Sequence, residues 1–142
     1  MTRAECAVMI WNILGQPPPG APCPFSDVAP GTYYHDAVTA LSRMGIVSGI
    51  GGGLFNPGGR MSREMGMAIQ ANTYGITPES AETYRAFTDH ALISEWARPY
   101  LSAMLERGYV EGVGGGRCAP GYNMTRAELI ALSIKVYDGE NA

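Results

Sequence analysis

Three copies of one short motif mark three helix starts in this chain of 142 residues. The letters M-T-R-A-E open the chain at 1–5 and recur at 124–128, and a degraded copy, M-S-R-E-M, occupies 61–65. A hydroxyl residue followed three positions later by Glu, directly before an apolar run, is the capping-box pattern of a helix N-terminus. The outer copies have this pattern, whereas Met65 replaces the capping glutamate in the middle copy. The motif therefore predicts three helices, of which the middle one is less well capped.

An arginine follows the capping residue in every copy: Arg3, Arg63 and Arg126. A cation at this position opposes the helix dipole and costs about 0.3 to 1 kcal/mol. Free backbone N–H groups at a helix start bind anions, and a guanidinium adds a planar fork that suits a carboxylate or phosphate. Because this unfavourable cation recurs at the same position of each repeat, we interpret these arginines as anion contacts. The alternative is three solvated surface arginines.

The remaining chain repeats itself around these starts. Phe25, Asp27 and Tyr34 match Phe87, Asp89 and Trp96 at an offset of 62, and the glycine loops that follow match at an offset of 63. Apolar spacing and terminal glycines predict helices over residues 5–14, 35–44, 62–74, 98–107 and 125–137. Residues 16–24 and 76–85 are Pro-rich or polar and are predicted to be linkers, the second with a nascent turn of helix after Pro78. Loop-helix-loop-helix repeats of this size must stack on their neighbours to bury an apolar face.

Composition narrows the classes of function. The net charge is -3 with 10 basic residues, which disfavours nucleic acid as a partner. No apolar run approaches 18 residues, and no export or membrane segment is visible, so we expect no membrane partner. The three cysteines show no metal-binding spacing and are expected to be buried or incidental thiols: Cys6, Cys23 and Cys118.

We found no set of residues that predicts catalysis. The glycines at 49–53 approximate a phosphate-binding loop but follow no strand and open no βαβ unit. His35 and His90 lie beside acidic residues, but they occupy different positions in the repeat and lack a third metal ligand. We therefore predict a protein that is not an enzyme and uses no cofactor or metal.

The order F-x-D, an aromatic residue before a helix, G-I-V-x-G, a glycine loop, L-F-x-P and T-R-A-E resembles the S-layer homology (SLH) domain. The resemblance implies one all-α domain over residues 1–142: the second half of a first repeat at 1–15, a second repeat at 25–76 and a third at 87–138. It also implies a pseudo-threefold arrangement, in which the T-R-A-E helices form a central three-helix bundle and the loop-helix parts project as prongs.

The resemblance implies a module that anchors secreted proteins, outside the cell, to secondary cell-wall polysaccharide of Gram-positive bacteria, often pyruvylated. By position, the implied ligand contacts are Arg3, Arg63 and Arg126 with their caps Thr2, Ser62 and Thr125, the aromatics Tyr34 and Trp96, the acids Asp27 and Asp89, and the glycines Gly53 and Gly116. The competing assignments are core packing for the aromatics, turn capping for the aspartates and turn geometry for the glycines. The alternative function is protein assembly in a surface layer, with the arginines paired to carboxylates of another protein.

Two departures from the family pattern matter. Cys118 stands where the family usually has Phe, and the first half of the first repeat is missing, so one prong is absent. We expect the missing prong to leave an exposed face, through which the chain has a modest tendency to form a homodimer.

Overall fold

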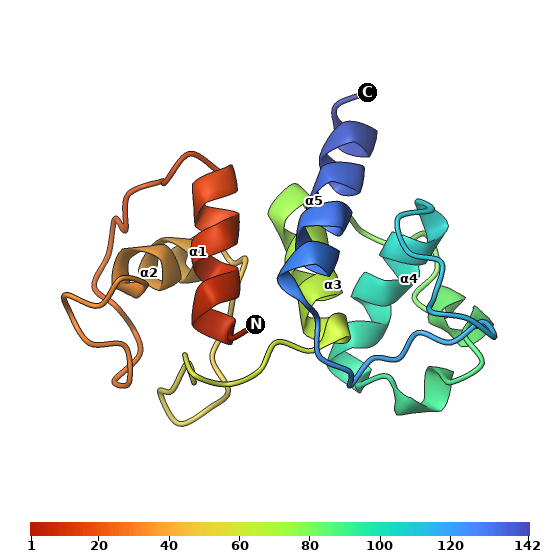
Figure 1. Cartoon of the computed structure of the whole chain (residues 1–142), viewed down its shortest axis with the longest axis horizontal. Helices are drawn as coiled ribbons and strands as arrows, with labels where there is room; N and C mark the ends of the chain where they lie inside the picture. The colour runs from red at the N-terminus through yellow and green to blue at the C-terminus, as the bar shows by residue number, and fades with distance from the viewer. The chain divides into compact units, whose positions relative to one another are not determined.

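The computed structural model describes all residues, 1–142, and confirms the predicted all-α fold (Figure 1). It contains no strand, only isolated bridges between single residues. None of its helices combines the length and the apolar character that crossing a membrane requires. The α-helices are α1 Arg3–Ile13, α2 His35–Arg43, α3 Arg63–Tyr74, α4 Arg98–Glu106 and α5 Arg126–Glu140, and the 3-10 helices are η1 Thr83–Ala86, η2 His90–Leu92 and η3 Glu95–Ala97.

The motif residues cap their helices as predicted. Thr2 accepts a hydrogen bond from Glu5 N at 3.1 Å, and the Glu5 carboxylate accepts one from Thr2 N at 3.2 Å, which completes a capping box on α1. Ser62 accepts from Met65 N at 3.3 Å, but a methionine has no carboxylate with which to return the bond. The middle helix therefore begins with half of a capping box.

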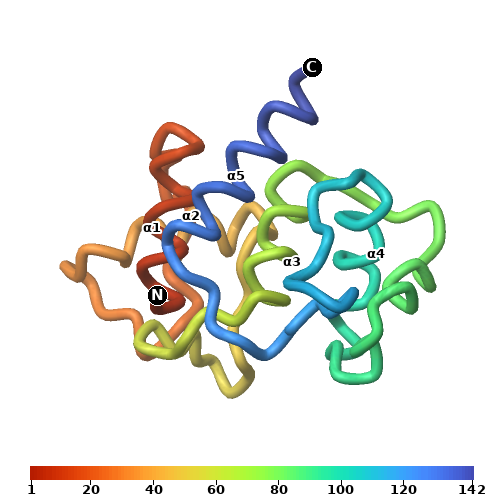
Figure 2. Tube along the Cα trace, turned by 45° about the vertical axis from the view of Figure 1, so that its right-hand side comes forward, coloured from red at the N-terminus to blue at the C-terminus, as the bar shows by residue number.

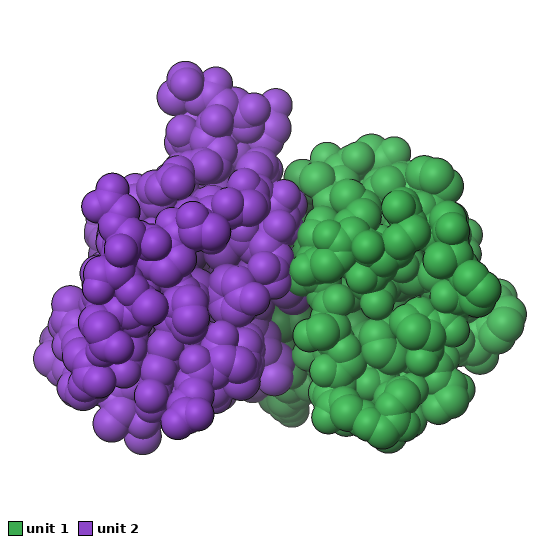
Figure 3. All heavy atoms as spheres, turned by 180° about the vertical axis from the view of Figure 1, so that it is seen from behind, with its two compact units in different colours: residues 1–61 green, residues 62–142 purple.

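The chain divides into two compact units, residues Met1–Met61 and Ser62–Ala142 (Figure 3). The boundary falls inside the second sequence repeat, between its loop and its T-R-A-E-type helix. Each unit thus combines the helix of one repeat with the loop and helix of the next repeat. The pseudo-threefold arrangement stays a prediction.

In unit 1, α1 packs against α2. Fully buried side chains of the two helices and of the glycine loop form its core, among them Ile10, Leu41 and Phe55. The Pro-rich segment between the helices has no regular secondary structure and is bonded to both helices. Trp11 Nε1 donates to the Pro17 carbonyl at 2.8 Å, and Arg43 Nε donates to the Pro19 carbonyl at 2.8 Å. These bonds fasten the predicted linker to the helices that it connects.

In unit 2, α3 contacts both α4 and α5. Figure 2 shows the chain running from α3 to α4 and then returning along a long loop to the start of α5. A buried hydrogen bond of 2.6 Å joins Gln70 on α3 to Ser133 on α5. Gly66 on α3 leaves room for Met124, since a side chain at 66 would meet the Met124 sulfur at 2.2 Å. Small and polar residues therefore set how closely these helices approach.

Two local predictions were incomplete. Helix α5 continues to Glu140, beyond the predicted end near Tyr137, because the Glu140 carboxylate accepts hydrogen bonds from Tyr109 and Arg107 on the facing loop. In the predicted linker at 76–85, η1 begins at Thr83, and the Glu106 carboxylate accepts from the backbone N–H groups of residues 79 and 80.

Candidate functional site: arginine clamps and a cationic groove

The motif arginine of unit 1 is almost completely buried. Arg3 is 8% exposed, and its guanidinium donates to the Phe55 carbonyl at 2.9 Å and to the Ser48 carbonyl at 2.8 Å. The guanidinium also lies over the Phe55 ring, 4.6 Å from its centroid. Burial lowers the pKa of Arg3, and the residual negative potential of nearby groups, including Asp27, opposes this shift. The arginine after the cap therefore fastens the glycine loop of the next repeat to the start of α1.

Unit 2 repeats this clamp at equivalent positions. Arg63 Nε donates to the Cys118 carbonyl at 3.0 Å, and Cys118 corresponds to Phe55 at the offset of 63. Here one terminal nitrogen also forms an ion pair of 2.8 Å with Glu128, the capping glutamate of α5. The Arg63 side chain is 14% exposed. Two of its five N–H groups are used in this way, which leaves three for another acceptor.

The backbone N–H groups at the starts of α1 and α3 are also occupied. Arg3 N donates to the Gly59 carbonyl at 2.8 Å, and Ala4 N donates to the Pro57 carbonyl at 3.0 Å. The corresponding bonds in unit 2 run from Arg63 N to Tyr122 and from Glu64 N to Pro120, at 2.8 and 3.1 Å. The loop carbonyls thus take the place that the sequence argument reserved for an external anion at these two helix starts.

An aspartate holds each loop from its other side. The Asp27 carboxylate accepts from Phe55 N and Asn56 N, both at 2.8 Å. The Phe55 bond is the main reason that the pKa of Asp27 lies below its ordinary value. This is the geometry of the turn-capping alternative.

Asp89 makes the same pair of bonds to Cys118 N and Ala119 N, at 2.7 and 2.8 Å. Burial by itself would raise the pKa of Asp89, but the two backbone donors outweigh it, so the pKa is lowered. The peptide of residue 55 or 118 is therefore held between an arginine and an aspartate in both units.

The start of α5 differs from the other two motif helices. Thr125 and Arg126 are exposed, and Thr125 accepts from Glu128 N at 3.1 Å. Farther along, Ile130 and Ile134 are 46% and 57% exposed. The equivalent residues on α3, Met67 and Ala71, are only 2% and 0% exposed. Helix α5 thus presents to solvent the face that α3 buries within its unit.

The other predicted contacts lie in loops. Trp96 is 51% exposed, whereas Tyr34 is half-buried and packs edge-on against Tyr33 at 5.0 Å between centroids. Gly53 and Gly116 have φ values of 73° and 71°, which suit glycine. Their carbonyls accept from the backbone N–H groups of residues 26 and 88, at 3.0 and 2.9 Å, so both glycines fasten their loops.

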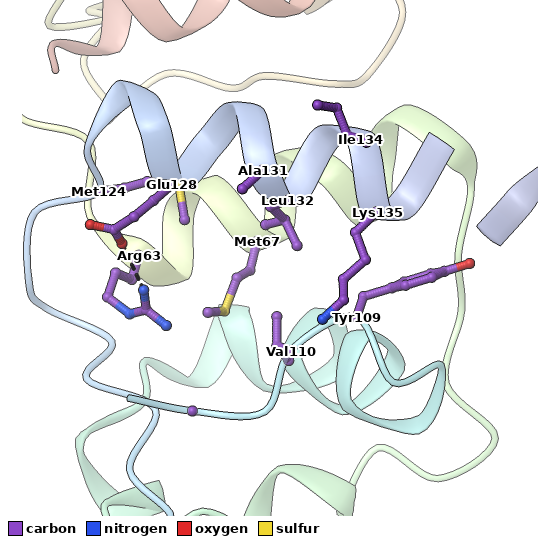
Figure 4. A pocket seen from close by; sticks show the side chains of 11 residues that line it. Arg63, Met67, Tyr109, Val110, Met124, Glu128, Ala131, Leu132, Ile134 and Lys135 are labelled. Atoms are coloured by element: carbon purple, nitrogen blue, oxygen red, sulfur yellow. Dashed lines mark hydrogen bonds and ion pairs between the residues drawn. The ribbon is translucent and has the colours of Figure 1, made fainter. Parts of the chain in front are cut away.

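A groove of about 610 Å³ lies within unit 2 (Figure 4). Its walls come from α3, from α5 and from the loop that follows α4. Figure 4 shows Arg63 and Glu128 at one end, Met67 in the middle, and Lys135 beside Tyr109 and Val110 at the other end. Of the twelve residues predicted as ligand contacts, Arg63 is the one that lines this groove.

Tyr109 and Lys135 line the groove but are not among the residues predicted from the sequence. Lys135 is the only lysine in the chain, and it lies two helical turns after Glu128 on the same helix. Its presence on α5 alone was a detectable signal, since the equivalent residues of the other motif helices are Asn12 and Asn72. Tyr109 gave no such signal, because its position depends on contacts with the far end of α5.

The cysteines are free thiols. Burial raises the pKa of both Cys6 and Cys118 to about 12, and Cys23 is half-buried. No group of three or more potential metal-binding side chains lies close together.

Comparison with known proteins identifies the family of the chain. Residues 24–64 and 86–130 match the S-layer homology domain. Amylopullulanase of Thermoanaerobacterium thermosulfurigenes is 33% identical over 93% of this chain, and exoglucanase XynX of Acetivibrio thermocellus is 30% identical over 99%. The surface-layer 125 kDa protein of Lysinibacillus sphaericus is 27% identical over 100% of the chain.

The matched region is a small part of each relative. The chain covers 7%, 13% and 12% of the lengths of these three proteins, respectively. The matched family segments together comprise more than half of the chain, and they include both loop-helix repeats, the clamp residue Arg63 and the third motif arginine, Arg126. The chain belongs to the S-layer homology domain family.

Proposed function

We propose that this domain is a non-catalytic module that anchors the protein carrying it to the outside of a bacterial cell wall. Relatives named as surface-layer proteins and relatives named as polysaccharide-degrading enzymes share the same domain. A function common to both groups cannot be the chemistry of one of them. Attachment to the cell surface is an accessory function that would serve both.

The ligand that we propose is secondary cell-wall polysaccharide that carries acidic groups such as pyruvate ketals. The observation that carries this proposal is the groove of unit 2, in which two cations, Arg63 and Lys135, outnumber the one acid, Glu128, on a chain with a net charge of -3. A cationic groove on an acidic protein attracts an anion locally rather than by a broad field. Its apolar wall, which includes Val110, suits the hydrophobic faces of sugar rings.

We rank the three arginines by the exposure of their side chains and by whether they line the groove. Arg63 has three N–H groups beyond its two bonds and lines the groove, and Arg126 is exposed at the start of α5. Arg3 is buried and clamps two loop carbonyls. The proposed ligand contacts are therefore Arg63 and Arg126, and the role of Arg3 is to hold the scaffold.

The other predicted contact residues would support ligand binding in lesser ways. Trp96 is exposed enough for a sugar ring to stack on it, more so than Tyr34. Thr2, Ser62 and Thr125 cap the helices that carry the arginines. Asp27, Asp89, Gly53 and Gly116 shape the loops and would act on a ligand only through their exposed edges.

The arginine part of the proposal is tested by cosedimentation with purified, protein-free cell walls. Arg126→Gln is the informative variant, because an exposed side chain can be changed without opening the core. A functional charged hydrogen bond contributes about 1.5 to 3 kcal/mol, so the variant should need a clearly higher wall concentration to pellet. Arg85→Gln, which removes an exposed arginine of the linker region, is the matched control. Equal pelleting of both variants would contradict a role for Arg126.

A second candidate function is assembly with other copies of the chain. The exposed Ile130 and Ile134 on α5 favour it, because isolated apolar residues are common on surfaces but a helical stripe marks an interface. Ile134 also lines the groove, so a polysaccharide in the groove and a second copy on this stripe would share part of one face of α5.

A further inference from the structure

The groove of unit 2 has a cation at each end, and the two cations are in different electrostatic situations. Arg63 pairs with Glu128 at 2.8 Å, so its charge is largely matched within the groove. Lys135 makes no hydrogen bond or ion pair with any residue of the protein. Because Glu128 and Lys135 are seven residues apart on α5, they lie about 10 Å apart along the helix axis. The unmatched positive charge of the groove is therefore at its Lys135 end.

Hydrogen bonds to Glu140 hold the side of the groove beside Lys135. The Tyr109 hydroxyl donates to the Glu140 carboxylate, which raises the pKa of Tyr109, and Arg107 donates to the same carboxylate at 2.7 Å. The Tyr109 ring lies directly on Gly139, where a side chain would meet the hydroxyl oxygen at 2.3 Å. A fixed aromatic ring next to a lysine forms a surface on which a sugar ring can lie while its acidic group reaches the ammonium (Figure 4).

Lys135 distinguishes the third motif helix from the other two. Asn12 and Asn72 occupy the equivalent positions of α1 and α3, and neither can supply a positive charge. The long lysine stem lies along the groove near Leu132, and the ammonium reaches Tyr109 and Val110 at the far end (Figure 4).

We propose that Lys135 is a second anion contact, and that the groove selects a polysaccharide that offers an acidic group to each of its two cations. One group would bind the free N–H groups of Arg63, and the other would bind the Lys135 ammonium, with the connecting sugar over Met67 and Val110. This inference rests on the proposed function, because it names the charge pattern of the polymer that the groove binds. It predicts that polymers with repeated acidic groups bind more tightly than saccharides with a single acidic end.

The single lysine allows a test by chemistry as well as by mutation. Acetylation removes the charge of Lys135, whereas reductive dimethylation keeps it, and the N-terminal amine is the only other primary amine modified. The acetylated Lys135→Arg variant controls for the N-terminus. Lys135→Gln and Lys135→Arg form the corresponding pair of variants, and thermal melting checks that each is folded.

The measurement is the concentration of purified acidic wall polymer that gives half-saturation, with a singly acidic saccharide for comparison. We expect acetylation and Lys135→Gln to weaken binding of the polymer about three- to tenfold and so to reduce the preference for the polymer over the singly acidic saccharide. Dimethylation and Lys135→Arg should retain binding. If the parent binds the polymer and Lys135→Gln binds it equally well, this inference is wrong and the proposed function stands. If the folded parent binds no polymer, both are wrong.

Discussion

Arg63 and Glu128 come from the capping motifs of two successive repeats and form an ion pair of 2.8 Å inside the groove of unit 2. On α1, the motif glutamate Glu5 completes a capping box. Its equivalent on α5, Glu128, instead pairs with the arginine of the preceding motif. The same arginine holds the Cys118 carbonyl, so one side chain joins α3, α5 and the glycine loop. Any anion that binds Arg63 must compete with Glu128 or share the guanidinium with it.

This competition predicts the effect of Glu128→Gln. The substitution removes the negative charge nearest to Arg63 while an amide oxygen can still accept a hydrogen bond from it. We expect the affinity for acidic wall polymer to rise about two- to fivefold, in line with the small free energy of a partly exposed ion pair. Glu111→Gln, at an exposed acid outside the groove lining, should change the affinity little. Weaker binding by Glu128→Gln, measured by titration calorimetry, would show that Glu128 supports the site instead of competing in it.

The helices were predictable from the sequence, whereas the clamps were not. Capping residues, apolar spacing and terminal glycines are local signals, and they located all five α-helices. Arg3 and Arg63 donate to backbone carbonyls 52 and 55 residues away. Every residue has a backbone carbonyl, so the residue type does not reveal which one is the acceptor. Arg3 was predicted to be an anion contact, and in the structure it is buried and donates to two loop carbonyls.

The groove depended on similar long-range contacts. Its wall at Tyr109 exists because α5 runs past Tyr137 to Glu140 and presents Gly139 to the ring. No residue at Tyr137 predicts the end of α5 there, and no residue near Tyr109 in the sequence predicts its hydrogen bond to Glu140. The recurring arginines located one end of the groove, and the other end required the structure.

The hydrogen bonds from loop N–H groups to Asp27 and Asp89 predict how the free energy of unfolding changes at low pH. Asp27 has a lowered pKa, so its stabilising effect is present above the ordinary pKa of 3.8 and is lost as the pH falls through the lowered value. Asp27→Asn removes one of two acceptor oxygens for backbone N–H groups and should lower the free energy of unfolding by about 1 to 2 kcal/mol. Urea unfolding at pH 7 measures this free energy, and Asp138→Asn is the exposed control. A decrease as small as that of the control would contradict a stabilising role for the Asp27 hydrogen bonds.

The buried thiols predict the response to alkali. Cys6 and Cys118 have pKa values raised to about 12, above the ordinary value of 9.0, so the folded state keeps protons that the unfolded state releases. Stability should therefore decline as the pH rises above about 9, and native thiols should react slowly at pH 8. A thiol reagent should modify Cys23 first, and unfolding should expose all three cysteines. Rapid modification of all three in the native protein would contradict the burial of Cys6 and Cys118.

The apolar stripe on α5 predicts self-association. Ile134→Glu places a charge in a face that is 57% exposed, so it should leave the fold intact and weaken any dimer. Light scattering over a concentration series should show a rising mass for the parent and a constant monomer mass for the variant. Tyr33→Glu, at another exposed apolar residue, is the control and should behave as the parent does. A parent that stays monomeric at high concentration would argue against the dimer.

The most direct test of the central claim is cosedimentation of the unmodified chain with cell walls from which all protein has been removed. The account predicts that the chain pellets with the walls and that a soluble pyruvylated saccharide releases it. Binding should also weaken with salt, because cations of the groove contribute to it. A folded chain that stays in the supernatant at every wall concentration would contradict the proposal that this domain anchors proteins to wall polysaccharide.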